Sequence, residues 1–253
     1  MNGGTKEVEI LNEKFQKVRD RIVGIQRERY GIGTLAEKTM HNILKNYYSG
    51  SEDFQEIPVN EFVADIYMDG HIIEIQTGNF NKLRKKLDSF LEEYKVTIVY
   101  PVVYNRYITY IDKETGALSE KRKSTRKDTY YTAFKELYKI KTYLNHPNLT
   151  LRLLMLEADE YKLENPNLKN KRRRAEKYDI VPSKILDEMV IECSRDFIQL
   201  IPVELEDDFT AKDFAKAAKI HVSYAGVILN IFNYLKIVER VGKSGNSYIY
   251  EVK

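Results

Sequence analysis

The dipeptide Asp69-Gly70 is the feature that most constrains how this chain folds. It stands between two runs rich in β-branched and aromatic residues, 62–68 and 71–77. Asp-Gly in this setting predicts a two-residue type I′ turn, because both residues tolerate the positive φ angles that such a turn requires. The sequence therefore predicts an antiparallel hairpin whose register is fixed by the turn.

That register brings two carboxylates together. Counting outwards from the turn, Asp65 faces Glu74 on the opposite strand. Directly opposed like charges destabilise an antiparallel pair, so a cation is expected between them. Gln76 follows Glu74 by two residues and projects from the same face of its strand. The three side chains form a patch of oxygen atoms on rigid strands, which suits a divalent metal ion.

Further helices and strands are predicted on both sides of the hairpin. Apolar residues spaced three or four apart indicate helices over 6–28, 34–48, 80–94 and 129–143. Apolar β-rich runs indicate strands over 55–59, 95–103, 106–112 and 150–157, with a charged loop over 113–128. Because a helix lies between them, strands 71–77 and 95–103 are expected to be parallel.

The composition is that of a globular chain, with 253 residues of which 43% are apolar and 31% charged. A net charge of +3 is too small to identify a nucleic-acid partner by itself. The single cysteine, Cys193, excludes an internal disulfide framework and fits a reducing cytoplasm. The chain starts with polar and charged residues, and no apolar run is long enough to cross a bilayer. We therefore expect a cytoplasmic protein with no membrane partner.

The character of the sequence changes near residue 165. The break Asn165-Pro166-Asn167 is followed by a basic tract that ends with Lys171, Arg172, Arg173 and Arg174. From about residue 176 the chain is predicted to be mostly helical, with a hairpin at its end. These changes predict a first domain over 1–164, a basic linker over 165–175 and a second domain over 176–253.

The order of elements around the hairpin resembles the PD-(D/E)xK nuclease superfamily, the restriction-endonuclease-like enzymes. In that superfamily an early helix supplies a Glu, one strand of a meander an Asp, and the next strand a Glu-x-Lys, before a helix and a parallel strand. The matching residues are Glu37, Asp65 and Glu74-Ile75-Gln76, and the resemblance covers residues 30–103. It implies an α/β fold, with a mixed sheet flanked by helices, in which Asp65, Glu74 and Glu37 hold Mg²⁺ or Mn²⁺.

Two positions depart from the pattern of that superfamily. Ala64 stands where Pro is usual, and Gln76 stands where a Lys usually orients the attacking water. Some members carry Gln at this position, so the resemblance still implies catalysis. Lys82, on the following helix, is the candidate to supply the missing ammonium group, with Lys86 one turn further along.

Each candidate residue also has an ordinary structural interpretation. Glu37 lies three residues after Thr34, which is the spacing of a helix capping box. Asp65 and Glu74 are alternatively solvated residues on an exposed sheet face, although their apolar neighbours favour a covered sheet. His41 lies on the same helix face as Glu37, where it is either a cleft residue or, more simply, a core or solvent-facing histidine. Gln76 and Lys82, each taken singly, are residue types typical of exposed positions.

Residues 209–250 have the pattern of a winged helix-turn-helix. Thr210 is placed to cap a short helix and Ser223 a second one, and a final hairpin forms the wing. The side chains available to contact DNA are few, namely Ser223, Tyr224, Asn230 and, at the wing tip, Lys243. Winged helices also serve as protein-interaction or dimerisation modules, so both roles stay open.

Two basic tracts are further candidates for contacts with phosphate. One combines 121–123 with 126–127, and the other contains Lys171, Arg172, Arg173 and Arg174. Lysine and arginine beside a nuclease-like domain would neutralise phosphates and make binding depend on salt. The alternative is that both tracts are solvated loop and linker segments.

Together these features predict a metal-dependent endonuclease that hydrolyses phosphodiester bonds in DNA. The main alternative is a catalytically degenerate nuclease fold that acts as a DNA-binding or transcription-regulatory module through its winged helix. A third hypothesis is a regulator whose first domain senses a ligand or mediates assembly. The long amphipathic helix over 6–28 also offers a surface on which two copies would pair as a homodimer.

Overall fold

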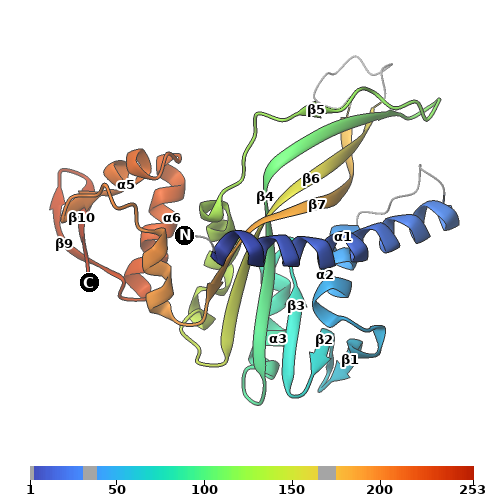
Figure 1. Cartoon of the computed structure of the whole chain (residues 1–253). Coiled ribbons are helices and arrows are strands. Elements are labelled where there is room, and N and C mark those ends of the chain that lie inside the picture. Colours follow the sequence, from blue (N-terminus) through green and yellow to red (C-terminus); the bar gives the residue numbers. More distant parts are fainter. Residues whose placement is uncertain (1–2, 31–38, 165–174) are drawn as a thin grey trace.

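The computed structural model describes residues 3–30, 39–164 and 175–253. They form an α/β unit built around one large mixed sheet, with a small C-terminal unit of two helices and a three-stranded sheet beside it (Figure 1). We call this second unit the winged-helix unit, after the sequence pattern that predicted it. Helices cover both faces of the large sheet, and a separate group of buried apolar side chains lies on each face. The predicted α/β class with a mixed sheet between helices is confirmed.

One face of the sheet is covered by α1 (Gly3–Tyr30) and α2 (Thr39–Ser49). These helices agree with those predicted over 6–28 and 34–48, except that residues 34–38 lie outside the described part of the chain. Their apolar stripes pack on the sheet because burial removes this surface from water. The largest buried side chains of the two stripes are Phe15, Ile22, Met40, Ile43, Leu44 and Tyr47.

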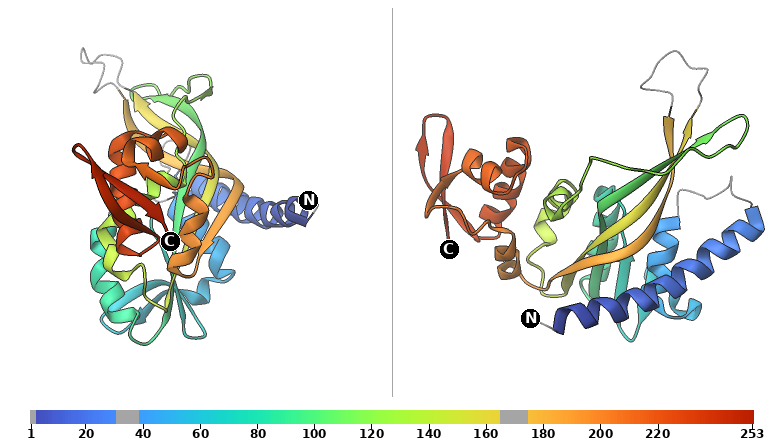
Figure 2. Two further views of the ribbon diagram at one scale, coloured as in Figure 1. Left: turned by 90° about the vertical axis from the view of Figure 1, so that its left-hand side faces the viewer. Right: turned by 45° about the horizontal axis from the view of Figure 1, so that its top comes forward.

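The large sheet has the strand order β1-β2-β3-β4-β6-β7, with β5 paired to β4. Its strands are β1 (Gln55–Val59), β2 (Phe62–Met68), β3 (His71–Ile75), β4 (Lys95–Asp112), β5 (Arg122–Lys123), β6 (Leu149–Glu164) and β7 (Ala175–Ile191). β3 runs parallel to β4, as the crossover predicts, and β4 runs parallel to β6. The C-terminal halves of β4 and β6 and the N-terminal half of β7 extend together beyond β1, β2 and β3 (Figure 2).

The hairpin of β2 and β3 has the predicted register. Met68 pairs with His71, and the pairing continues to Ile66 and Ile73. Asp69 and Gly70 have φ angles of 47° and 78°, so both turn residues lie in the left-handed region that a type I′ turn requires. Local turn chemistry therefore sets which residues of the two strands lie opposite each other.

The second face of the sheet is covered by short helices. They are η3 (Phe80–Leu83) and α3 (Arg84–Phe90), then η4 (Tyr130–Ala133), α4 (Phe134–Leu137) and η5 (Tyr138–Tyr143). The sequence predicted one helix over 80–94 and one over 129–143. Both regions are helical, but each combines α-helical and tighter 3₁₀ turns, and the second has a kink at Ile140.

The prediction of a domain boundary at 165–175 was wrong for the residues that follow it. β7 pairs antiparallel with β6 along its whole length, so residues 175–191 belong to the large sheet and are not helical. Pro182 lies in the middle of β7, beside a shift in register opposite Ala158. Proline and charged residues weaken the sequence pattern of a strand, although proline is tolerated at such irregularities.

The winged-helix unit begins after η7 (Ser194–Leu200). Its elements are β8 (Asp208–Thr210), α5 (Ala211–Ala217), α6 (Val222–Tyr234), β9 (Val238–Ser244) and β10 (Ser247–Val252). Thr210 caps α5 in a capping box with Asp213, as predicted. Ser223 does not cap α6, because His221 is the capping residue and its ring accepts a hydrogen bond from the Ser223 N–H.

Aromatic side chains join the two units into one core. Phe134 of α4 lies edge-on to Phe232 of α6, with ring centroids 5.5 Å apart, and Phe197 of η7 packs against both rings. All three side chains are fully buried. The winged helix is therefore fixed to the large sheet unit by apolar packing, and η7 belongs to the same contact.

The helix α1 also covers the free edge of β7. Asn12 exchanges two hydrogen bonds with the backbone of Ile185, donating to the carbonyl at 2.8 Å and accepting from the N–H at 2.9 Å. The Gln16 side chain donates to the Ser183 carbonyl. The described apolar face of α1, which suggested a homodimer, packs on α2 and β7 of the same chain.

We predict that Phe232→Ala lowers the free energy of unfolding by about 3–5 kcal/mol, because it leaves a cavity where the two units meet. Urea unfolding followed by circular dichroism measures this change, and the wild type is expected to unfold in a single transition. The control is Val203→Ala, since Val203 is 94% exposed, and its effect should stay within about 0.5 kcal/mol. Separate transitions of the two units in the wild type would contradict the common core.

Candidate active site

The two carboxylates of the hairpin lie where the ladder between β2 and β3 stops. Regular pairing ends at Ile66 and Ile73, one residue before Asp65 and Glu74. There the side chains replace backbone partners. The Asp65 N–H donates to Glu74 Oε1 at 3.3 Å, and the Ile75 N–H donates to Asp65 Oδ2 at 2.8 Å. Each carboxylate is thus held on the backbone of the strand opposite, so both are fixed at the same point of the sheet.

Two basic side chains reach this pair from opposite layers. Lys86 of α3 places its Nζ 2.8 Å and 3.0 Å from the two carboxylate oxygens of Glu74. His41 of α2 places Nε2 3.2 Å from Asp65 Oδ2. The Glu74 side chain is 0% exposed and that of Asp65 is 19% exposed, so water screens the pair weakly. Lys86 is thus a cation in contact with the pair, and His41 is a hydrogen-bonding partner.

The environment moves the two carboxyl groups in opposite directions. Burial and the charge of the neighbouring Asp65 raise the pKa of Glu74 to about 7, although the charge and hydrogen bonds of Lys86 act to lower it. Burial also acts to raise the pKa of Asp65, but the hydrogen bonds from His41 and the Ile75 N–H, together with the charges of His41 and Lys86, outweigh it, so that pKa is lowered. Asp65 is therefore the firmly ionised member, and Glu74 exchanges a proton near neutral pH.

The other predicted catalytic residues have different positions. Gln76 is half-buried just beyond β3, and its N–H donates to the Val99 carbonyl at 2.9 Å. Lys82 is exposed on η3, and the contact predicted for it is made by Lys86 one turn later. Glu37, the third predicted metal ligand, lies outside the described residues. The signal that would have identified Lys86 is its place on the inward-facing stripe of α3, one residue before the buried Leu87.

The described donors of this site suit a hard divalent cation. Within residues 39–164 and 175–253, no group of three or more His, Cys, Asp or Glu side chains is arranged to hold a metal ion. Mg²⁺ nevertheless binds through one or two carboxylates, keeps several waters and takes further oxygen ligands from substrate phosphates. Asp65 and Glu74 supply two carboxylates whose mutual repulsion such an ion would relieve. The donor set is therefore compatible with Mg²⁺ or Mn²⁺.

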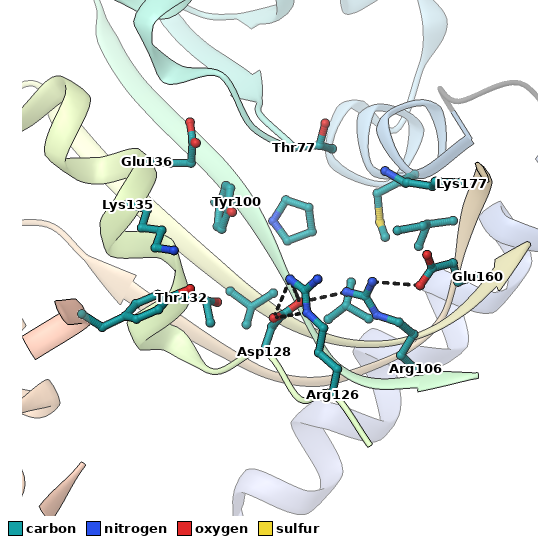
Figure 3. A pocket seen from close by; sticks show the side chains of 16 residues that line it. Thr77, Tyr100, Arg106, Arg126, Asp128, Thr132, Lys135, Glu136, Glu160 and Lys177 are labelled. Carbon is teal, nitrogen blue, oxygen red and sulfur yellow. Dashed lines mark hydrogen bonds and ion pairs between the residues drawn. The ribbon is translucent and has the colours of Figure 1, made fainter. Parts of the chain in front are cut away.

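A cleft adjoins the carboxylate pair. It has a volume of about 470 Å³ and lies between β4, the helices η4 and α4, and α6 of the winged-helix unit (Figure 3). Met40, next to His41 in the chain, lines it, and so does Thr77, which follows Glu74 by three residues. Neither carboxylate lines the cleft itself, but three residues of chain span at most about 10 Å, so Thr77 brings the edge of the cleft within that distance of Glu74.

The residues predicted to contact nucleic acid are divided between several places. Tyr224 lies under the Lys135 ammonium, and Asn230 accepts a hydrogen bond from Lys141, so both contact the large unit and do not form an exposed DNA-reading face. Ser223 is exposed and pairs with His221. Lys243 is exposed on the wing, 5.0 Å from the Tyr248 ring centroid. The candidates Lys171, Arg172, Arg173 and Arg174 lie outside the described residues.

Comparison with known proteins places this site in a family. Residues 38–192 match the family model described as "Domain of unknown function (DUF8091)". The chain belongs to this family. The DUF8091 segment runs to the residue after β7, so it contains Asp65, Glu74, Lys86 and His41 and leaves out α1 and the winged helix.

An uncharacterized protein of Treponema pallidum (strain Nichols) is similar over a longer stretch. The two are 28% identical over 202 residues, which cover 77% of this chain and 78% of that protein. No solved structure matches the chain. Among its described helices, none is both long and apolar enough to cross a membrane.

We predict that the raised pKa of Glu74 makes the free energy of unfolding fall as pH rises. The folded protein keeps a proton on Glu74 that the unfolded chain releases above its ordinary pKa of about 4.3. The stability linked to this proton is present below that value and is lost as pH rises through about 7, the folded pKa. Between pH 5 and 8, wild type should lose roughly 2–3 kcal/mol relative to Glu74→Gln.

Urea unfolding at a series of pH values measures this difference, and Glu92→Gln is the control because Glu92 is exposed. Parallel pH profiles for the wild type and Glu74→Gln would contradict the raised pKa.

Proposed function

We propose that this protein is a metal-dependent nuclease that hydrolyses phosphodiester bonds in DNA. The observation that carries the proposal is the pair Asp65 and Glu74, two carboxylates fixed at one point of a sheet and embedded between basic side chains. Burial and the neighbouring carboxylate raise the pKa of Glu74, so the basic side chains compensate the pair only in part. A divalent cation and an anionic substrate together fit such a site.

Asp65 and Glu74 would hold Mg²⁺ or Mn²⁺. When bound, the ion would supply an activated water and offset negative charge on the scissile phosphate. Asp65 is suited to this role because His41 keeps it ionised. Glu74 is suited to it because its backbone contact with Asp65 fixes its oxygens.

Lys86 is the residue that compensates for Gln76. In the nuclease superfamily that the sequence resembles, an ammonium group normally projects two residues after the glutamate. Here Lys86 brings an ammonium group to the same carboxylate from α3 and lies within 2.8 Å of it. A cation moved from the strand to the helix still offers positive charge to a phosphate bound beside Glu74.

A second candidate function rests on the same contact. Because Lys86 already neutralises part of the charge of Glu74, the site is also suited to a degenerate nuclease fold that binds nucleic acid without a metal ion. The two functions differ in one property, since the nuclease needs the metal ion and the binding module does not.

We predict that the wild type cleaves DNA in the presence of Mg²⁺ or Mn²⁺ and is inactive in EDTA. The substrates are a supercoiled plasmid and labelled duplex, branched and single-stranded oligonucleotides. Asp65→Asn and Glu74→Gln should each lower the rate by roughly 100-fold or more, since each removes a carboxylate that would hold the metal ion. Lys86→Ala should lower it by about 10- to 100-fold. Lys82→Ala is the matched control and should retain near-wild-type activity.

A metal-binding measurement tests the same site without an activity assay. Mg²⁺ at 100 times its dissociation constant should raise the free energy of unfolding of the wild type by about 2.7 kcal/mol. It should have little effect on Glu74→Gln, because that variant lacks one carboxylate. Equal stabilisation of both proteins would place the ion elsewhere. No stabilisation of the wild type, combined with no cleavage, would leave the binding module as the better account.

A further inference from the structure

The cleft near the carboxylate pair is lined by charged side chains of the large unit and by Tyr224 of the winged-helix unit. Four basic residues line it: Arg106, Arg126, Lys135 and Lys177 (Figure 3). On an exposed surface such charges are normally solvated separately, whereas here they line the same cleft. What they can bind depends on which of them are already neutralised.

Arg106 and Arg126 are held by carboxylates of the cleft itself. Arg106 donates to Asp128 at 2.8 Å and to Glu160 at 2.9 Å, and Arg126 also pairs with Asp128 (Figure 3). The Arg106 residue is only 8% exposed, and its Nε has no hydrogen-bond partner among the described residues. Because of these ion pairs, both arginines are neutralised within the wall of the cleft.

Lys135 and Lys177 have no ion-pair partner in the part of the chain that the structure describes. Lys135 is exposed and lies over the ring of Tyr224, with its Nζ 4.1 Å from the ring centroid. Lys177 is an exposed residue of β7.

Of the three carboxylates that line the cleft, Asp128 and Glu160 are held by the arginines, and Glu136 is held by Lys139 and the Phe80 N–H. Two ammonium groups therefore remain available. Their positive charge favours an anion in the cleft.

The winged-helix unit supplies one wall of this cleft. Tyr224 lines it and positions Lys135, while Asn230 accepts a hydrogen bond from Lys141 at 2.9 Å. Tyr224 and Asn230 both belong to α6, which corresponds to the recognition helix that other helix-turn-helix proteins insert into the major groove of DNA. In this chain α6 faces the large unit and takes part in its cleft.

We propose that the cleft binds the phosphate backbone of a nucleic-acid strand next to the bond hydrolysed at Asp65 and Glu74. This inference rests on the proposed function for the chemistry at the carboxylates. Lys135 and Lys177 lie on opposite sides of the cleft and are the contacts to the phosphate backbone of the strand (Figure 3). The Thr77 side of the cleft leads towards the carboxylate pair. The winged helix thus acts as part of the substrate site of its own chain.

The test measures binding separately from cleavage. Glu74→Gln protein in EDTA is titrated into fluorescein-labelled single-stranded and duplex oligonucleotides of one sequence, and anisotropy is recorded over a range of salt concentrations. Lys135→Ala and Lys177→Ala are added to this background one at a time. Lys243→Ala and Lys212→Ala are the controls, one on the wing and one on α5, and both lysines are exposed.

We expect each cleft substitution to weaken binding by about tenfold. Each should also reduce the slope of log K against log salt by about 0.7 for the single strand and 0.9 for the duplex. A purely structural role would not change this slope, and unchanged urea unfolding would show that both variants are folded. Replacement by arginine should restore most of the affinity.

Binding that is unchanged in both cleft variants, or that is absent for both oligonucleotides, would overturn the proposal. Loss of binding in Lys243→Ala with the cleft variants unaffected would also overturn it and would place the strand on the wing. The two proposals can fail separately. If binding depends on the cleft lysines but the wild type does not cleave DNA with metal, the nuclease proposal is contradicted and the phosphate-binding role of the cleft is retained.

Discussion

The contact between Glu74 and its surroundings is the interaction on which the account of this protein depends. A glutamate with no exposed surface, placed beside a second carboxylate, is unfavourable unless positive charge compensates for it. Lys86 provides part of that charge and makes two hydrogen bonds to the carboxylate. The pKa of Glu74 is still raised to about 7, so the compensation is incomplete. A site left in this condition is suited to a further cation, and it is costly to maintain for stability alone.

The sheet explains how this arrangement is kept rigid. The tight turn at Asp69-Gly70 fixes the register, and the ladder stops one residue short of the carboxylates. The two strands therefore separate where the side chains need room. Side-chain hydrogen bonds to the opposite backbone replace the missing ladder contacts. Helices α2 and α3 then deliver His41 and Lys86 from the two sides of the sheet. Local turn chemistry and the layered packing thus define the site together.

Much of this could be predicted from the sequence because it depends on short-range signals. The hairpin follows from two adjacent residues, and the parallel crossover from the helix between two apolar strands. Interactions between distant segments were harder to predict. Whether Lys82 or Lys86 reaches Glu74 depends on how the tight turn η3 orients α3. The strand β7 was missed because its pairing with β6 decides its conformation, whereas its proline and charged residues suggest a different one. The packing of α6 on the large unit is likewise a contact between distant parts of the chain.

The central claim is that Asp65 and Glu74 are only partly compensated by neighbouring basic residues and bind a divalent cation. Carboxyl ¹³C NMR of glutamate-labelled protein tests this claim most directly. The Glu74 signal is assigned from its absence in Glu74→Gln and is followed through a pH titration with EDTA and with Mg²⁺. The account predicts a pKa of about 7 in EDTA, and a signal that stays ionised to markedly lower pH when Mg²⁺ is present. An ordinary glutamate pKa in EDTA, or a titration that Mg²⁺ leaves unchanged, would contradict it.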